Sequence, residues 1–189
     1  MIKDYTINCK GNLINLNVPK VMGILNVTPD SFFDGGQNNS IQTALKQTEK
    51  MLSEGADFID IGGMSSRPGA EIITLEEERQ RVIPVLEAIL KEFPNTLVSI
   101  DTFRVDIANE TIQKGASIIN DISGGDQDLK MFETIAKLRC PYILMHMRGT
   151  AETMQSKTEY DNVTIEVIQE LSAKIEKLKR LNVKDIIID

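Results

Sequence analysis

The sequence predicts an α/β protein whose core is a parallel sheet, and it favours closure of that sheet into a barrel. Six short runs rich in Ile, Val and Leu alternate with segments of helical periodicity, which is the pattern of repeated βα units. Each run ends in a polar or charged residue, and barrel enzymes keep their active sites at the carboxyl ends of their strands. An open, doubly wound sheet shares the element order, so the polar strand ends are what favour the barrel.

Composition and charge limit the kind of protein. The 189 residues are 41% hydrophobic and 26% charged, as expected for a single domain over residues 1–189. A net charge of −7 argues against general binding to nucleic acid or to an anionic membrane. No apolar run could span a bilayer and no signal peptide is recognisable. With only two cysteines, Cys9 and Cys140, we expect a reduced, cytoplasmic protein.

The first elements follow from alternation and capping. Residues 5–18 alternate apolar and polar side chains around a Lys-Gly-Asn turn, which predicts a hairpin that covers one end of the core. A buried strand then begins at Val21 and passes into a polar loop after Asn26. Ser40 can cap a helix that runs to Glu54, before a glycine.

The middle of the chain repeats the alternation. Residues 57–63 and 97–101 are expected to be buried strands, and Thr74 with Glu77 forms the capping box of the helix between them. That helix runs to about residue 92, and Pro84 is expected to kink it. Helices at 104–114 and 128–138 and strands at 117–121 and 142–147 follow in turn.

The last elements are a long helix and a sixth strand. The helix is expected over about residues 161–181 and the strand over 185–189. Apolar residues at helical spacing predict which side of the helix is buried: Val163, Val167, Leu171, Ile175 and Leu178.

Five motifs, in order along the chain, resemble the dihydropteroate synthase family. They are MGILNVTPDSFFDGG (22–36), DIGGMSSRPGA (60–70), SIDTFR (99–104), INDISGG (119–125) and LMHMRGTAETMQ (144–155). The resemblance implies a TIM (β/α)8 barrel, of which this chain covers an N-terminal hairpin and strands one to six. It also implies the transfer of 6-hydroxymethyl-7,8-dihydropterin from its pyrophosphate to p-aminobenzoate, in folate biosynthesis, with sulfonamides as competitors of p-aminobenzoate.

A pterin presents an edge of alternating donors and acceptors, which buried carboxylates and carboxamides can match. Residues of that type stand at predicted strand ends, namely Asp101, Asn120 and Asp189. By the resemblance, Asp121 and Met145 line the same pterin pocket and Asp60 supports it. Loss of Asp101 is expected to affect binding far more than loss of a surface acid.

The departing pyrophosphate carries negative charge, which a cation would stabilise. Mg²⁺ is suited to this because it favours phosphate and other oxygen ligands. Asn26 matches the metal-contacting position of the family. Asp30 and Asp34 could reach the same site from their loop, although acids in a loop are more often simply solvated. No general base is required, because an aromatic amine is already a neutral nucleophile at pH 7.

The p-aminobenzoate site is assigned by the resemblance alone. It implies Phe32, Ser66, Arg67 and Pro68, which lie in the loops after the first two strands. Arg67 has the planar fork suited to a carboxylate or a phosphate. The single histidine, His146, lies in an apolar strand and is interpreted as a hydrogen-bonded core residue.

Relatives continue past the position of Asp189 into two more strands, which bring a Lys and an Arg-x-His segment. We therefore expect a chain truncated at its C-terminus, with little turnover on its own and with a homodimer possible for the full-length enzyme. Two other functions stay open. One is a non-catalytic pterin-binding fragment, and the other is the pterin domain of a methyltetrahydrofolate-dependent methyltransferase, which should lack the TPDSF and SRPG loops.

Overall fold

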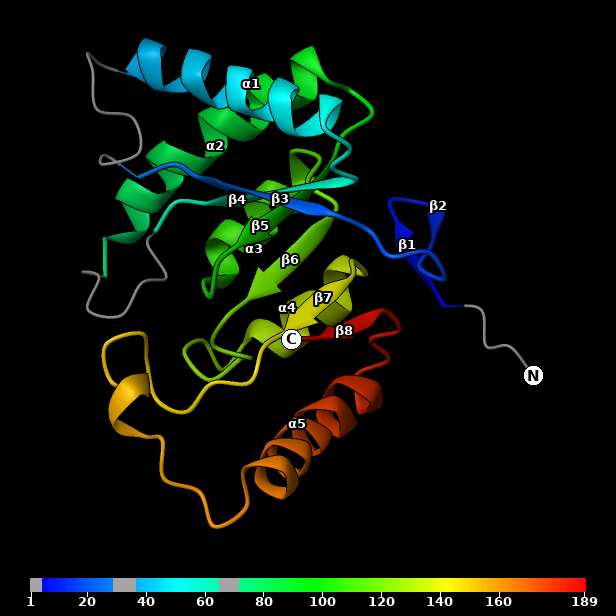
Figure 1. The fold of residues 1–189 in the computed structure, drawn as a ribbon, viewed down its shortest axis with the longest axis vertical. Coiled ribbons are helices and arrows are strands. Elements are labelled where there is room, and N and C mark those ends of the chain that lie inside the picture. Colours follow the sequence, from blue (N-terminus) through cyan, green and yellow to red (C-terminus); the bar gives the residue numbers. More distant parts are fainter. Residues whose placement is uncertain (1–4, 29–36, 65–71) are drawn as a thin grey trace.

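Six parallel strands form the centre of the fold, and their order in space follows their order in the sequence (Figure 1). The computed structural model describes residues 5–28, 37–64 and 72–189. The strands are β3 (Met22–Asn26), β4 (Phe58–Gly62), β5 (Leu97–Asp101), β6 (Ile118–Asp121), β7 (Tyr142–Leu144) and β8 (Ile186–Ile188). A doubly wound sheet would reverse its order near the middle, so the sequential order confirms the barrel topology.

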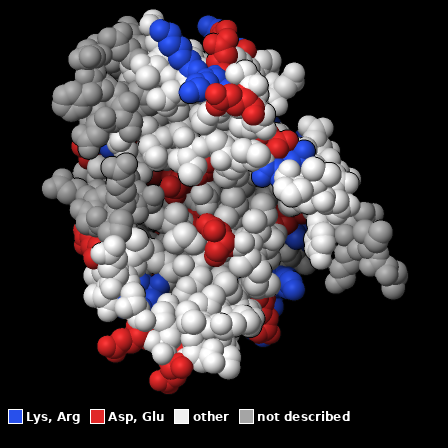
Figure 2. Space-filling view, in the orientation of Figure 1, with Lys and Arg blue, Asp and Glu red and all other residues white. Residues whose placement is uncertain are grey.

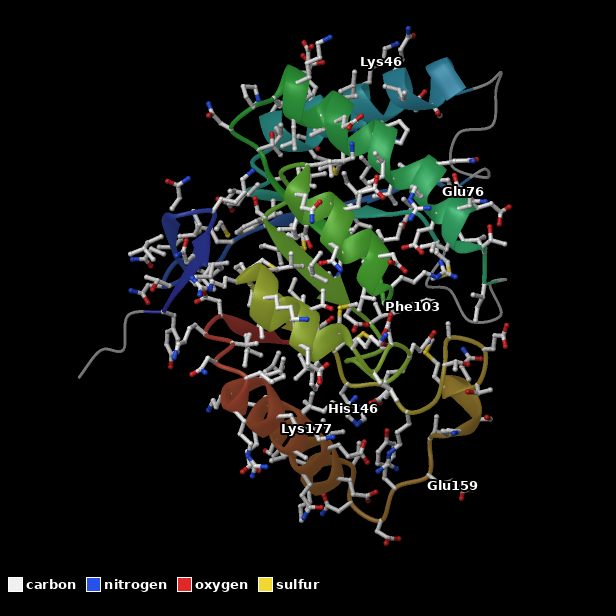
Figure 3. The ribbon with its side chains drawn as sticks, turned by 180° about the vertical axis from the view of Figure 1, so that it is seen from behind. Lys46, Glu76, Phe103, His146, Glu159 and Lys177 are labelled. Atoms are coloured by element: carbon white, nitrogen blue, oxygen red, sulfur yellow. The ribbon has the colours of Figure 1, made fainter. Side chains whose placement is uncertain are left out.

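Helices cover one face of the sheet, as the view from behind shows (Figure 3). They are α1 (Gln37–Ser53), α2 (Leu75–Glu92), α3 (Val105–Gln113), α4 (Met131–Leu138) and α5 (Val163–Arg180), with a short 3-10 helix at Met154–Ser156. The main apolar core lies between this layer and the sheet, where Ile59, Leu86 and Ile100 are fully buried. Among the described residues, no helix is long and apolar enough to cross a bilayer.

The helix caps with the clearest sequence patterns are confirmed. Thr74 Oγ1 accepts the Glu77 N–H at 3.2 Å, and Glu77 Oε2 accepts the Thr74 N–H at 2.9 Å, which confirms the capping box of α2. Gly55 and Gly115 have φ angles of 105° and 111° just after α1 and α3, as helix-ending glycines do. The assignment of Ser40 as a cap is wrong, because α1 already begins at Gln37. Polar residues are compatible with both a cap and a first turn, so the pattern left the boundary open.

One strand boundary and one predicted buried residue also differ from the prediction. β7 ends at Leu144, so the residues up to Met147 lie beyond the strand. Its three residues pair with Ile186–Ile188 of β8. In α5, Leu171 and Leu178 are buried as predicted, but Val163 is 55% exposed because it stands at the first position of the helix.

A hairpin of β1 (Thr6–Cys9) and β2 (Asn12–Asn15) lies at the amino ends of the sheet strands (Figure 1). Lys10 and Gly11 connect the strands with φ angles of 55° and 90°, as a two-residue hairpin turn requires. Ile7 and Cys9 pack into a second apolar cluster with the sheet residues Phe58, Ile118 and Ile143. The prediction that the hairpin covers one end of the core is confirmed.

Candidate active site

The register of the sheet gathers four strand ends into one row. Asn26 of β3 pairs with Gly62 of β4, Gly62 with Asp101 of β5, and Asp101 with Asn120 of β6. Since alternate residues of a strand share a face, Asp60 lies on the same face as Gly62, one pleat lower. This is the carboxyl end of a parallel barrel sheet, where such folds place their active sites.

A concavity of about 460 Å³ opens on this face, and its polar lining consists of Lys20, Asp60, Asn120 and Asp189. Apolar side chains form the rest of the wall, and Met22, Phe58 and Ile118 are the first residues of their strands, so the cavity extends along the inner face toward the amino ends. Asp101 is not among the residues that line it. Figure 2 looks onto this side of the molecule, where acidic atoms stand within a mostly uncharged centre. Three of the predicted pterin-binding residues therefore line one cavity.

Three buried side-chain oxygens on this face of the sheet lack a hydrogen-bond partner within the described part of the chain, and one of them is the Ser99 hydroxyl, which stands beside Asp60 in the register. Asn120 donates from Nδ2 to Asp60 Oδ2 at 3.0 Å, which orients both side chains. The remaining oxygens, Asp60 Oδ1 and Asn120 Oδ1, have no hydrogen-bond partner among the described residues. Buried polar atoms are normally paired, and the Ser99 hydroxyl is placed to donate to Asp60, so Asn120 Oδ1 is the acceptor that points to a ligand with N–H or O–H donors.

Asp101 has an unusual electrostatic environment. Burial, and to a lesser extent the negative charges of Asp60, Glu78 and Asp121, together raise the pKa of its carboxyl group to about 8. Burial also raises the pKa of Asp60, while the Ser99 hydroxyl and the Asn120 amide oppose that rise. Asp60 is buried and Asp101 is half-buried, and two acids with raised pKa values on the inner face of the sheet are typical of a functional site.

The absence of a side chain at Gly62 leaves space beside two side-chain oxygens that could bind a metal ion. A methyl group at this position would come within 3.3 Å of Asn26 Oδ1 and 3.4 Å of Asp101 Oδ2. Among the described residues, no group of three His, Cys, Asp or Glu side chains is arranged as a metal site. Magnesium commonly takes only one or two protein oxygens together with phosphate oxygens, so the pair beside Gly62 fits such an ion.

The structure does not bring Asp121 to the cavity. Its side chain is fully buried on the helix-covered side, where Oδ1 accepts bonds from the N–H and the hydroxyl of Ser123. Oδ2 accepts bonds from the Gly125 N–H at 2.9 Å and from the Tyr142 hydroxyl at 2.7 Å. All four bonds come from the protein, so the Asp121 carboxylate orders the turn after β6. Alternation along β6 could have revealed this, since Asn120 occupies the opposite face.

The remaining predicted residues divide into two groups. Met145 is half-buried just beyond β7, and Asp189 follows β8 with its carbonyl accepting the His146 N–H at 3.0 Å. The other group lies outside the described residues: Asp30, Phe32, Asp34, Ser66, Arg67 and Pro68.

Two polar residues after β7, His146 and Arg148, bond to α5. His146 is half-buried, and its Nε2 lies 2.8 Å from Glu170 Oε2 of α5 (Figure 3). The hydrogen bond predicted for His146 is confirmed, but its placement in the core of an apolar strand is wrong, because β7 ends at Leu144. Arg148 forms ion pairs with Glu166 and Glu170 and lies 3.9 Å from the Tyr160 ring centroid, which fixes the segment after β7 to α5.

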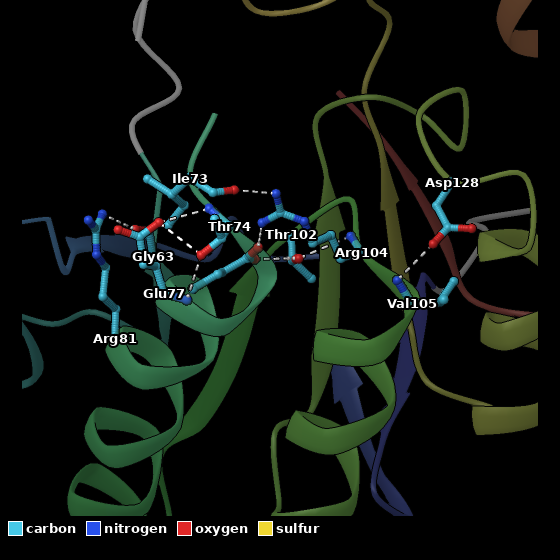
Figure 4. A network of polar contacts seen from close by, with 10 residues as sticks. Gly63, Ile73, Thr74, Glu77, Arg81, Thr102, Arg104, Val105 and Asp128 are labelled. Atoms are coloured by element: carbon cyan, nitrogen blue, oxygen red, sulfur yellow. Dashed lines mark hydrogen bonds and ion pairs between the residues drawn. The ribbon is translucent and has the colours of Figure 1, made fainter. Parts of the chain in front are cut away.

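A buried ion pair between Glu78 of α2 and Arg104 was not predicted from the sequence (Figure 4). In the sequence, Glu78 stands within a run of three glutamates at the start of a helix. Such a run is normally solvated, and only the crossing of α2 over the sheet identifies the glutamate that points inward.

Comparisons with known proteins agree with this geometry. A sequence model described as pterin binding enzyme matches residues 22–189. The dihydropteroate synthase of Synechocystis is 44% identical over 89% of the chain, and that of Escherichia coli is 47% identical over 84%. The chain spans 59% and 55% of the lengths of these two relatives.

Solved structures extend the likeness to the fold. The Yersinia pestis dihydropteroate synthase in complex with a sulfonamide drug superposes with a TM-score of 0.88 at 38% identity, over 98% of this chain and 67% of that one. The Xanthomonas albilineans enzyme in complex with 7,8-dihydropteroate gives a TM-score of 0.83 at 34% identity, over 98% of this chain and 65% of that one.

Proposed function

The chain belongs to the family of pterin-binding enzymes, and on that premise we propose that its protein is a dihydropteroate synthase. The observation that supports this most directly is the unpartnered Asn120 oxygen, held beside Asp60 in the cavity on the inner face of the sheet. A pterin has N–H donors along one edge, and a cavity with apolar walls and a few convergent acceptors suits such a flat heterocycle.

Asp101, Asn120 and Asp189 would bind the pterin edge, with Asp60 holding the Asn120 amide in place. Asp101 would accept N–H donors as a carboxylate, because a charge-assisted bond in a buried site is stronger than a neutral one. Met145 would contact the ring from the segment after β7. For Asp121 we propose a supporting role through the turn at residues 121–125, since its oxygens are already bonded.

The reaction is a substitution at the pterin methylene. The bond between this carbon and the pyrophosphate oxygen breaks, and pyrophosphate departs with the electron pair. The amine nitrogen of p-aminobenzoate supplies the new bond to the carbon and then loses a proton to solvent. The methylene carbon develops positive charge in this SN1-like process and the pterin ring shares that charge, so a carboxylate bound to the ring edge would stabilise the transition state.

Asn26 would hold Mg²⁺ beside Gly62, with Asp101 as the adjacent oxygen. When bound there, the ion would neutralise charge on the departing pyrophosphate. The p-aminobenzoate site is proposed from the resemblance alone, with Phe32, Ser66, Arg67 and Pro68 in contact. A sulfonamide should then compete with p-aminobenzoate.

The test is pyrophosphate release by the full-length protein. It is given the pterin pyrophosphate with and without p-aminobenzoate and with and without Mg²⁺, and pterin binding is measured by calorimetry in parallel. We expect release that needs both p-aminobenzoate and Mg²⁺. Asp101→Asn should abolish most of it, whereas Asp106→Asn, an exposed acid on the neighbouring α3, should not.

Other outcomes would identify other functions. Pterin binding without turnover would favour the non-catalytic alternative, and absence of both binding and turnover would contradict the proposal. A homodimer and a cytoplasmic location stay predictions, to be checked by light scattering and by fractionation.

A further inference from the structure

Met145 lies just beyond β7, and the main-chain bonds around it determine which face of the sheet it occupies. The β7–β8 pairing ends at Leu144, but two bonds continue the pattern by one residue. The Asp189 N–H donates to the Leu144 carbonyl at 3.1 Å, and the His146 N–H donates to the Asp189 carbonyl at 3.0 Å. Met145 therefore stands opposite Asp189. Since alternate residues share a face, Met145 lies on the inner face with Ile143 and Asp189, which both line the cavity.

His146, the next residue, faces the helices. Its Nε2 lies 2.8 Å from Oε2 of Glu170 on α5, and its side chain is 14% exposed (Figure 3). The bonds to Asp189 fix the main chain at Met145 within the plane of the sheet. The imidazole fixes the same stretch of main chain against the helix layer.

The Glu170 carboxylate is oriented by Arg148, whose three guanidinium nitrogens all have acceptors. Nε donates to Glu170 Oε1 at 2.9 Å, and Nη1 donates to the Glu159 carbonyl at 3.1 Å. Nη2 donates to Glu166 Oε2 at 2.7 Å and also to Glu170 Oε1. Because the guanidinium group is planar and rigid, these bonds hold the carboxylate in one orientation. Oε1 is taken by the arginine, and Oε2 is directed at His146.

A partly exposed ion pair contributes little to stability, and the side chain of Glu170 is 38% exposed. The effect of the network on position is larger, because the paired part of β7 has only three residues and ends before Met145. We propose that Glu170 is a positioning residue that, through His146, holds Met145 on the inner face and thereby sets the affinity for the pterin. The inference rests on the proposed function, in which Met145 contacts the pterin ring.

The experiment is a double-mutant cycle on the full-length protein. The calorimetric Kd for the pterin pyrophosphate is measured for wild type, Glu170→Ala, Met145→Ala and the double variant. We expect each single substitution to weaken binding about tenfold, since a misplaced side chain loses much of the contact that a missing one loses. The double variant should be within about threefold of Met145→Ala, because the position of residue 145 no longer matters once its side chain is gone.

Glu170→Gln tests the link more conservatively. The amide can bond to His146 in either tautomer of the imidazole, so this variant should keep its Kd within about threefold of wild type. If Glu170→Ala does not fold, His146→Ala replaces it in the cycle, because it removes the same link and leaves the carboxylate bonded to Arg148.

Two variants on the same helix are the controls. Glu176 pairs with Arg180, but its side chain is 64% exposed, so Glu176→Ala should change neither Kd nor Tm. Leu178 is fully buried in the main apolar core, so Leu178→Val should lower the Tm and keep the wild-type Kd.

The outcomes separate two failures. A wild type that binds no pterin contradicts the proposed function, and the positioning role falls with it. In a wild type that binds, an unchanged Kd in Glu170→Ala or in Met145→Ala contradicts the positioning role alone, as do losses that simply add in the double variant. If Leu178→Val weakens pterin binding as much as Glu170→Ala does for the same fall in Tm, Glu170 only stabilises the fold.

Discussion

Asp101 is the residue whose electrostatic environment bears most directly on the proposed pterin binding. Its carboxyl group lies at the end of β5 with Asp60, Glu78 and Asp121 close enough to raise its pKa. In water such an acid would be ionised at neutral pH, but here burial and like charges keep the proton on near pH 7. A ligand that offers N–H donors would need the ionised form.

We therefore predict that pterin affinity rises with pH through about 8, the pKa of Asp101. Replacing Asp101 by Asn should cost about 2–5 kcal/mol of binding free energy and flatten this dependence. Calorimetric titration with the pterin between pH 6 and pH 9 checks both statements. An unchanged pH profile in the variant would show that another group titrates.

The stability of the folded chain should show the opposite sign. The folded state holds the Asp101 proton above the ordinary value of 3.8, so the protonated group favours folding. That contribution is complete below the unfolded pKa and is lost as the pH rises through about 8. Urea unfolding should then show wild type losing stability relative to Asp101→Asn between pH 5 and pH 8.5.

Gly62 gives a second prediction at the residue scale. In Gly62→Ala the new methyl group would lie within 3.4 Å of both Asn26 Oδ1 and Asp101 Oδ2, so it occupies the space proposed for the ion. We expect the Mg²⁺ concentration for half-maximal activity to rise about tenfold or more while the fold is kept. Activity against Mg²⁺ concentration measures this.

Gly23→Ala is the control, on the neighbouring strand β3. Its methyl group would meet Met51 Sδ at 2.6 Å, on the helix side of the sheet. This variant should lose stability but keep its response to Mg²⁺. Equal Mg²⁺ responses in the two variants would contradict the assignment of the space beside Gly62.

At the scale of elements, β6, its turn and β7 are held together by the Asp121 carboxylate. Tyr142→Phe removes one of the four bonds to this buried group, and burial already raises the pKa of Asp121. We predict a loss of about 1–3 kcal/mol in the free energy of unfolding, with pterin affinity unchanged. Urea denaturation and calorimetry on the same preparations provide both values.

Tyr5→Phe supplies the comparison, because Tyr5 is 62% exposed on the hairpin. It should change neither quantity. A fall in pterin affinity for Tyr142→Phe that exceeds its loss of stability would return Asp121 to the ligand-binding set.

At the scale of the whole molecule, the hairpin adds a second core to the inner side of the sheet. Ile7 is 4% exposed there and packs with Phe58, Ile118 and Ile143. Ile7→Ala should lower the free energy of unfolding by about 2–5 kcal/mol, because it removes buried methyl groups and leaves a void. Leu13→Ala, 72% exposed on the same hairpin, should cost far less. Similar losses would mean that the hairpin does not contribute to the core.

The sequence by itself determined the periodic features of this protein. The alternation of strands and helices, the capping box at Thr74, the hairpin turn and most of the polar strand ends are local patterns found where they were predicted, whereas His146 lies beyond β7. Asn26, Asp101 and Asn120 could be found in this way because parallel strands bring their carboxyl ends to one edge. The family motifs then supplied the chemistry to expect there.

Only the tertiary structure decided which of these polar groups meet. Asp121 adjoins Asn120 in the sequence, but the pleat turns its carboxylate toward the helices, where Tyr142 and Ser123 bind it. Glu78 is one of three consecutive glutamates, and only the packing of α2 on the sheet buries this one against Arg104. Partners such as these lie 21 and 26 residues apart in the chain, so their contacts depend on how elements pack and not on any local pattern.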